Sequence, residues 1–248
     1  MHSILVYHTI NEPDGPTACA ETISPERFEE QLRWLSRRRR VVSLEETLIR
    51  SRKESLVAIT FDDGYRDNLT TALPLLEKYS LPMTLFVVAG FVDRDGYLSE
   101  EELREMAGHP LVTIGSHGLW HSNFTSLATD EARFELRESK QILEEIIAGK
   151  VDLLAWPYGE CNPELERLSG ACGYRASWSV WKGTNGAHSR WRVPLGGRDH
   201  MVRFIAKSCG LYALTEARLH RATAGRRPVP VPSATGSSPG TTRLKTIA

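Results

Sequence analysis

The sequence predicts an α/β fold in which a sheet is either wound with helices or closed into a barrel. Two observations lead to this prediction. Short apolar runs rich in β-branched residues recur along the chain, and amphipathic segments with helix start signals separate them. Strand and helix alternate about six times, which is typical of a parallel sheet covered by helices. In either arrangement, ligands bind at the carboxyl ends of the strands.

The predicted strands are continuous apolar runs, without the alternation of a half-exposed strand. Continuous runs suit strands that are buried on both faces, as in a parallel sheet. They are Ser3 to Tyr7, Leu56 to Phe61, Pro82 to Val88, Leu111 to Ile114, Asp152 to Trp156 and Ala176 to Val180.

The segments between the strands carry helix signals. Ser24 followed by Pro25 fits an N-cap with proline at the first helical position. We expect the basic run Arg37 to Arg40 to close this helix, where cations complement the helix dipole, and not to bind nucleic acid. The other signals are apolar stripes at Phe28-Leu32-Leu35, Leu69-Leu73-Leu76-Tyr79 and Leu136-Leu143-Ile146, and capping-box spacing at Ser43 with Glu46 and Ser99 with Glu102.

Composition and charge describe a folded chain without a general affinity for polyanions. Its 248 residues, 41% of them hydrophobic, are enough for one α/β domain with a large core. Lys and Arg total 31, as do Asp and Glu, so the formal net charge is zero. This balance disfavours nucleic acid and anionic membranes as partners and suits a neutral sugar polymer.

The chain divides near residue 221. We expect residues 1–221 to form a single domain and residues 222–248, rich in Pro, Gly, Ser and Arg, to be disordered. No apolar run approaches the roughly 20 residues of a membrane span, and the start lacks the pattern of a signal peptide. These features predict a cytoplasmic protein. We expect separate reduced thiols at the four cysteines, Cys19, Cys161, Cys172 and Cys209, whose spacing fits neither a zinc site nor a disulfide scaffold.

Two adjacent carboxylates, Asp62 and Asp63, follow the apolar strand that ends at Phe61 and precede Gly64. A plain turn would explain this segment, with one Asp capping the helix that begins near Arg66. The functional alternative is that both carboxylates face one cleft at the strand end. One would then bind a metal ion, and the other would stay free as a base.

Two histidines, His117 and His121, follow another predicted strand. At positions i and i+4 they would share one face of a helical turn and could chelate one divalent ion. A solvated histidine pair is the structural alternative. With one added carboxylate the set becomes a three-ligand site with open positions, where an ion activates water and polarises a carbonyl oxygen.

Two weaker signals also lie at predicted strand ends. Pro157-Tyr158-Gly159 reads as a turn, and His8 follows the first strand. A lone histidine in such a place is more often structural than catalytic. In a barrel, however, all four segments would converge on one rim.

The sequence resembles the polysaccharide deacetylase family, the NodB-homology domain of carbohydrate esterase family four, over residues 3–215. The first family motif is matched by Thr60 to Gly64, the second by His117 and His121, and the third by Pro157 to Gly159. The resemblance implies a distorted (β/α) barrel. It also implies hydrolytic removal of an N-acetyl group from an amino sugar in a polysaccharide or glycan precursor, with release of acetate.

The resemblance further implies the roles of the motif residues. Asp63, His117 and His121 would hold one divalent metal ion, which we expect to be zinc, with cobalt or nickel as alternatives. Asp62 would act as general base on the attacking water, and the backbone N–H of Tyr158 would stabilise the oxyanion.

The general acid is assigned by a second resemblance. Tyr7-His8 is similar to a subgroup that includes exopolysaccharide deacetylases of the poly-N-acetylglucosamine type. In that subgroup the motif order is permuted and the acid histidine comes from the first strand. We therefore expect His8 to be the acid, with His200 as the alternative; His188 is the other late histidine.

Two positions depart from the family pattern. Gly118 stands where the second motif usually has Ser or Thr, and Trp156 stands where the third often has an arginine that orients the base. Asp62 therefore needs another partner, such as a histidine or Arg198. Three tryptophans are candidates for stacking on sugars, with core packing as the alternative for each: Trp120, Trp178 and Trp181.

Other functions on the same fold are hydrolysis of a non-sugar linear amide or a cyclic ureide, and binding of carbohydrate without catalysis. The last is disfavoured because both aspartates and both motif histidines are present. The partner we expect is an N-acetylated saccharide, either a finished polymer or a lipid-linked precursor met at the inner membrane face. The sequence does not determine the oligomeric state.

Overall fold

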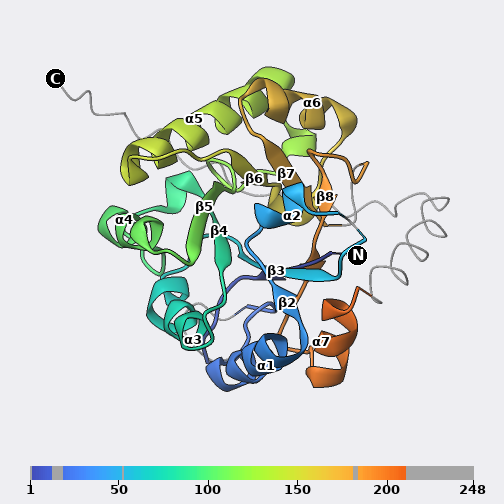
Figure 1. Cartoon of the computed structure of the whole chain (residues 1–248). Coiled ribbons are helices and arrows are strands. Elements are labelled where there is room, and N and C mark those ends of the chain that lie inside the picture. The colour runs from blue at the N-terminus through green and yellow to red at the C-terminus, as the bar shows by residue number, and fades with distance from the viewer. Residues whose placement is uncertain (1, 13–18, 52, 181–183, 211–248) are drawn as a thin grey trace, which may run out of the picture.

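The computed structural model describes residues 2–12, 19–51, 53–180 and 184–210. Within them, parallel strands form a central barrel and helices surround it (Figure 1). The predicted α/β barrel is therefore confirmed. The proposed tail, residues 222–248, and the end of the proposed domain, residues 211–221, lie outside the described residues.

All six predicted strands are present, with ends that differ by at most two residues from the prediction. Three further strands of two residues each were not predicted, because so short a segment has no hydrophobic period. The strands are β1 Ser3–Tyr7, β2 Arg40–Val41, β3 Leu56–Phe61, β4 Met83–Val87, β5 Val112–Ser116, β6 Leu153–Ala155, β7 Ala176–Ser179, β8 Arg190–Trp191 and β9 Val193–Pro194.

Two of the three capping signals mark the start of a helix, whereas the helix after Ser43 begins only at Glu46 and does not have Ser43 as its N-cap. Ser24 accepts a hydrogen bond from the N–H of Arg27, and Ser99 forms a full capping box with Glu102. The basic run does not wholly close the first helix, because Arg40 already belongs to β2. The helices are α1 Pro25–Arg38, α2 Glu46–Ile49, the π-helical η1 Asn68–Ala72, α3 Leu73–Lys78, α4 Glu100–Gly108, α5 Thr129–Ile147, α6 Pro163–Ala171 and α7 Met201–Ser208, with short 3₁₀ turns η2 Ala89–Phe91, η3 Phe124–Ser126 and η4 Pro157–Gly159.

One short segment joins the two edges of the sheet. The strand order is β8-β7-β6-β5-β4-β3-β1-β9, with β2 added on β3, and the pairs are parallel. Only Arg192 separates β8 from β9. Its N–H donates to the carbonyl of Ser179 on β7 at 2.9 Å, and the N–H of Leu195 donates to the carbonyl of Val6 on β1 at 2.9 Å. Residues 190–195 therefore close the barrel, with Arg192 at the junction.

The core has an inner and an outer part. Ile4, Ala58, Phe86 and Trp178 pack inside the barrel together with Leu44, which precedes α2; in Figure 1, α2 lies in front of the strands. Because Trp178 is fully buried, the proposal that it stacks on sugars is wrong. The outer core lies between strands and helices and includes a cluster of three rings, those of Tyr7, Phe28 and Phe61.

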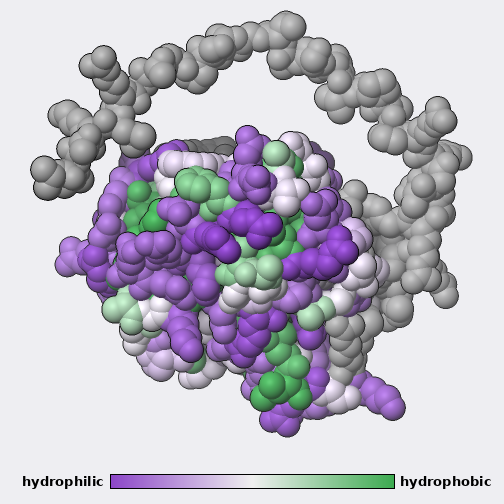
Figure 2. All heavy atoms as spheres, turned by 90° about the horizontal axis from the view of Figure 1, so that it is seen from above, coloured by the Kyte–Doolittle hydropathy of each residue, from purple (hydrophilic) through white to green (hydrophobic). Residues whose placement is uncertain are grey.

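The face of the molecule seen from above is mainly hydrophilic (Figure 2). The face seen from above in Figure 2 shows hydrophobic residues only as small, separate patches among charged and polar ones. None of the helices in the described ranges combines the length and the apolar character needed to cross a bilayer.

Candidate active site

The barrel interior becomes polar toward the carboxyl end of β3. Ala58 lies in the inner core, the hydroxyl of Thr60 donates to the carbonyl of Leu5 at 2.8 Å, and Asp62 follows two residues later on the same face. The N–H of Asp62 still donates to the carbonyl of Tyr7, so β1 pairing continues past the last residue of β3. This alternation places the Asp62 carboxylate inside the barrel, at the end where the carboxyl ends of the strands lie.

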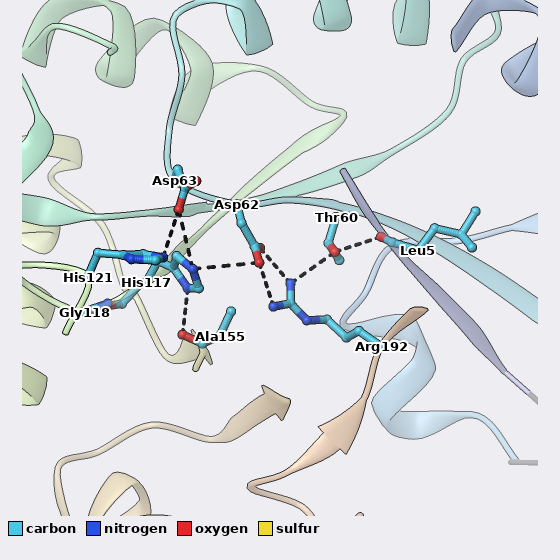
Figure 3. Close-up of polar contacts among 10 residues, drawn as sticks. Leu5, Thr60, Asp62, Asp63, His117, Gly118, His121, Ala155 and Arg192 are labelled. Carbon is cyan, nitrogen blue, oxygen red and sulfur yellow. Dashed lines mark hydrogen bonds and ion pairs between the residues drawn. The ribbon is translucent and has the colours of Figure 1, made fainter. Parts of the chain in front are cut away.

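A sharp turn brings the second carboxylate to the same side. Asp63 has a φ of 75° and Gly64 a φ of 84°, both in the left-handed region that non-glycine residues rarely adopt. Without this turn, adjacent side chains of a strand would point to opposite faces. Figure 3 shows the carboxylates of Asp62 and Asp63 both directed toward His117.

His117 follows β5 and is 2% exposed. Its Nδ1 lies 2.8 Å from the carbonyl oxygen of Ala155. A carbonyl can only accept a hydrogen bond, so Nδ1 carries the proton and Nε2 keeps a free lone pair, as a metal-binding imidazole requires. Burial lowers the pKa of His117, which favours this neutral form. Nε2 lies 3.6 Å from Oδ1 of Asp63 and 3.8 Å from Oδ2 of Asp62.

The second histidine reaches the site through a loop. The helical turn expected for His117 and His121 is wrong, because residues 117–123 form no helix. Gly118 has a φ of 82° and His121 a φ of 56°, and these two bends bring Nε2 of His121 to 3.4 Å from Oδ1 of Asp63. A Cβ at position 118 would lie 3.1 Å from the Phe124 ring, so glycine fits this loop where Ser or Thr would be strained.

Glu135 on α5 fixes this loop. The residue is 7% exposed, and its carboxylate accepts hydrogen bonds from the backbone N–H groups of Leu119, at 3.4 Å, and Trp120, at 3.3 Å. It also accepts one from the hydroxyl of Ser122. Sequence reasoning missed Glu135, because on the sequence it is one acidic residue among many on an amphipathic helix.

Asp63, His117 and His121 fit one metal ion. Each offers a ligand atom, and the three atoms lie within 4.8 Å of one another. Oδ1 of Asp63 is buried and has no hydrogen-bond partner, although a buried carboxylate oxygen normally has one. A set of two imidazoles and one carboxylate suits Zn²⁺ and similar borderline ions and leaves positions open for ligands. The predicted ligand set is thus assembled by the fold.

Asp62 is held by a different group, Arg192. Nη1 and Nη2 of Arg192 donate to Oδ1 and Oδ2 of Asp62, both at 2.7 Å (Figure 3). The Arg192 side chain is 1% exposed, and its guanidinium lies 5.2 Å from the Phe86 ring centre. The proposed partner Arg198 is wrong, since it is an exposed residue that lines another cavity.

The Arg192 guanidinium sets the charge state of Asp62. Burial by itself raises the pKa of a carboxyl group, but the charge of Arg192 and its hydrogen bonds bring the pKa of Asp62 down to about 2. Asp62 is therefore ionised at neutral pH and able to accept a proton. No local signal in the sequence reveals this partner, because Arg192 lies 130 residues away and outside any family motif.

The remaining predicted residues separate into two groups. His8 follows β1 and is close enough for its charge to lower the pKa of Asp62, and its buried Nδ1 has no hydrogen-bond partner. The ring of Tyr158 lies 4.7 Å from that of His121. His200, in contrast, is exposed at the start of α7, and His188 shares a hydrogen bond with Ser169 on α6.

The turn around Tyr158 is also left-handed. Tyr158 has a φ of 58° and Gly159 a φ of 64°, and a Cβ at position 159 would lie 2.5 Å from Val180. Trp156 is buried and donates from Nε1 to Ser177 and to the carbonyl of His188. It therefore has a packing role and does not replace the missing motif arginine.

We predict that His117→Ala lowers the bound metal to well below one ion per chain, since a ligand is lost. Elemental analysis after dialysis against zinc measures this, with His121→Gln as a second variant and His200→Ala as the matched control. Full metal occupancy in both ligand variants would remove these histidines from the metal centre.

We predict that Arg192→Met lowers the free energy of unfolding of the metal-free protein by about 3–5 kcal/mol, because a buried carboxylate loses its partner. The double variant Asp62→Asn/Arg192→Met should lose less than the sum of the two single variants. Urea unfolding gives these values. Arg50→Met, which breaks a surface pair with Glu46, is the control and should cost below about 1 kcal/mol. Additive losses at positions 62 and 192 would contradict the coupling.

Comparison with known proteins connects this geometry to a family. The polysaccharide deacetylase family model matches residues 49–177. The match includes both carboxylates, both histidines and the Tyr158 turn, whereas His8 and Arg192 lie outside it.

Curated relatives agree with this match. The Bacillus subtilis protein YxkH is 29% identical over 178 residues, which cover 69% of this chain and 62% of that protein. A poly-beta-1,6-N-acetyl-D-glucosamine N-deacetylase of Staphylococcus aureus is 29% identical over 177 residues, which cover 64% of this chain and 61% of the relative. The chain thus spans about three fifths of the length of these relatives.

Solved structures show the same fold. A polysaccharide deacetylase from Bacillus cereus superposes with a TM-score of 0.75 at 22% identity, covering 84% of this chain and 68% of that one. IcaB from Ammonifex degensii superposes with a TM-score of 0.69 at 24% identity, covering 84% and 96%. Together with the family model and the residues at the barrel rim, these similarities show that the chain belongs to the polysaccharide deacetylase family.

Proposed function

We propose that this protein is a zinc-dependent hydrolase that removes the N-acetyl group from an amino sugar in a polysaccharide or glycan precursor and releases acetate. One observation carries the proposal. An ionised carboxylate, Asp62, stands beside a separate Asp-His-His ligand set, so base and metal ligands are different groups in contact. The similarity to a relative named as an N-acetylglucosamine polymer deacetylase supports the sugar substrate.

The metal ion, when bound, would polarise the acetyl carbonyl and make water more acidic. Asp62 takes the proton of the attacking water. Its two oxygens stay fixed by the two Arg192 nitrogens, so its orientation toward the attacking water is set before substrate arrives. The backbone N–H of Tyr158 donates a hydrogen bond to the oxyanion that develops on the carbonyl.

The leaving nitrogen needs a proton, because an amide nitrogen departs as an amine. His8 supplies it. Its charge acts on Asp62, and the residue is only partly buried, so the ring can reach substrate. Asp62 thus acts as the base and His8 as the acid. Asp62 follows β3 and His8 follows β1, and these two strands are neighbours in the barrel.

We predict acetate release from N-acetylated glycans that stops when the metal is removed with a chelator and returns on addition of zinc. Asp62→Asn should keep the metal and reduce turnover by about 10²–10⁴-fold, the usual contribution of a general base. The substrate panel is a β-1,6-linked N-acetylglucosamine oligomer, a chitin oligomer, a lipid-linked precursor and a simple non-sugar amide. Exposed Asp95→Asn is the control. Turnover of only the non-sugar amide would replace the sugar hypothesis, and an active Asp62→Asn would remove Asp62 as base.

We predict that His8→Ala reduces turnover by about 10²–10⁴-fold with metal content unchanged, because the leaving amine is no longer protonated. Turnover and zinc content are measured on the same preparation. His200→Ala is the matched control and should be fully active. The reverse pattern, with a loss only in His200→Ala, would assign the acid to the late histidine instead.

A further inference from the structure

Two adjacent side chains after β3, those of Asp67 and Asn68, bind the segment that carries His8. The side-chain amide of Asn68 donates from Nδ2 to the carbonyl of His8 at 2.9 Å. The carboxylate of Asp67 accepts hydrogen bonds from the hydroxyl of Thr9 and, at 3.2 Å, from the N–H of Ile10. The backbone directly after His8 is therefore held by side chains from a distant part of the chain.

Asp67 and Asn68 are themselves buried and bonded to each other. Asn68 is fully buried, Asp67 is 9% exposed, and Nδ2 of Asn68 also donates to Oδ1 of Asp67 at 2.9 Å. Side chains of consecutive residues within a helix do not face each other. Asp67, however, precedes the π-helix η1 and Asn68 begins it, and here both side chains meet the same segment. Turns of π-helix are rare and occur frequently at functional sites.

The carbonyl of His8 lies just past the end of a strand. β1 ends at Tyr7, whose carbonyl accepts a hydrogen bond from the N–H of Asp62 at 3.0 Å. The carbonyl of Thr9 accepts a backbone N–H from the loop before α1 at 3.1 Å. Between these two bonds, the amide of Asn68 takes the place of a sheet hydrogen bond to His8. Three successive carbonyls are thus fixed around the histidine.

We propose that Asn68, supported by Asp67, positions His8 for proton transfer to the leaving nitrogen. This inference rests on the proposed function, in which His8 is the acid. Proton transfer requires hydrogen-bond geometry, and a displacement of about 1 Å can reduce a rate by about 10²-fold. Residues 62–68 then supply the proposed base, a metal ligand and the support of the acid, so that one segment fixes all three relative to one another.

The test compares turnover of an amide with turnover of an ester. An amide nitrogen leaves only when it is protonated, whereas 4-nitrophenyl acetate releases a stabilised phenolate that needs no proton. We expect Asn68→Ala to lower kcat on an N-acetylated glycan by about 10–10²-fold, with KM and zinc content within about twofold of the wild type. Turnover of the ester should stay within about twofold, since the metal ligands and the base are unchanged.

Two further variants separate positioning from folding. Thr9→Val removes the hydroxyl bonded to Asp67 with little change in size, and should show the same pattern with a smaller loss. In a double variant, Asn68→Ala should add nothing to the loss in His8→Ala, because it acts through that histidine. Thr47→Val is the matched control. It removes a buried hydroxyl that donates to a backbone carbonyl at 2.6 Å on α2, which follows the strand paired with the first residues of β3, and should leave both activities unchanged.

The outcomes that overturn the proposal are distinct from those that concern the substrate. Equal losses on glycan and ester would assign Asn68 a purely structural role, and losses that add in the double variant would show that it does not act through His8. Full glycan turnover in Asn68→Ala would also overturn the proposal. A wild-type chain that cleaves only a non-sugar amide would contradict the proposed sugar substrate, and the comparison of that amide with the ester would still decide the role of Asn68.

Discussion

The buried pair of Asp62 and Arg192 is the interaction on which the rest of the site depends. It joins the end of β3 to the segment that closes the barrel, so the carboxylate of Asp62, the proposed base, is oriented only when the sheet is complete. Such a pair contributes little net stability, because both charges lose their water. Its value is geometric: two parallel hydrogen bonds fix both carboxylate oxygens and keep the group ionised in a place where burial would favour the neutral acid.

Two adjacent aspartates acquire different roles because their surroundings differ. Asp62 faces a guanidinium inside the barrel, whereas Asp63 turns outward to two imidazoles and has an oxygen without a hydrogen-bond partner. The separation needs a left-handed backbone at Asp63, and the same conformation recurs at His121 and Tyr158. A non-glycine residue in the left-handed region of the backbone is strained, and the packing of the surrounding barrel rim offsets this cost in free energy.

Glu135 links the metal loop to the surface beside it. One buried carboxylate holds the N–H groups that set the position of Trp120 and, through it, of His121. The same residue lines a neighbouring cavity.

The sequence by itself determined the strands with a clear hydrophobic run, the capped helices, and the motif residues Asp62, Asp63, His117 and His121, because each of these is specified by near neighbours in the chain. It did not reveal β8, β9 or Arg192, since a two-residue strand has no period and the arginine meets its partner only when the barrel closes. The loop geometry of the histidines and the role of Glu135 were likewise decided by tertiary structure. Short motifs and capping signals consist of residues close together in the chain, so they can be recognised in the sequence. The partner of a buried charge is set by long-range packing, which no local pattern encodes.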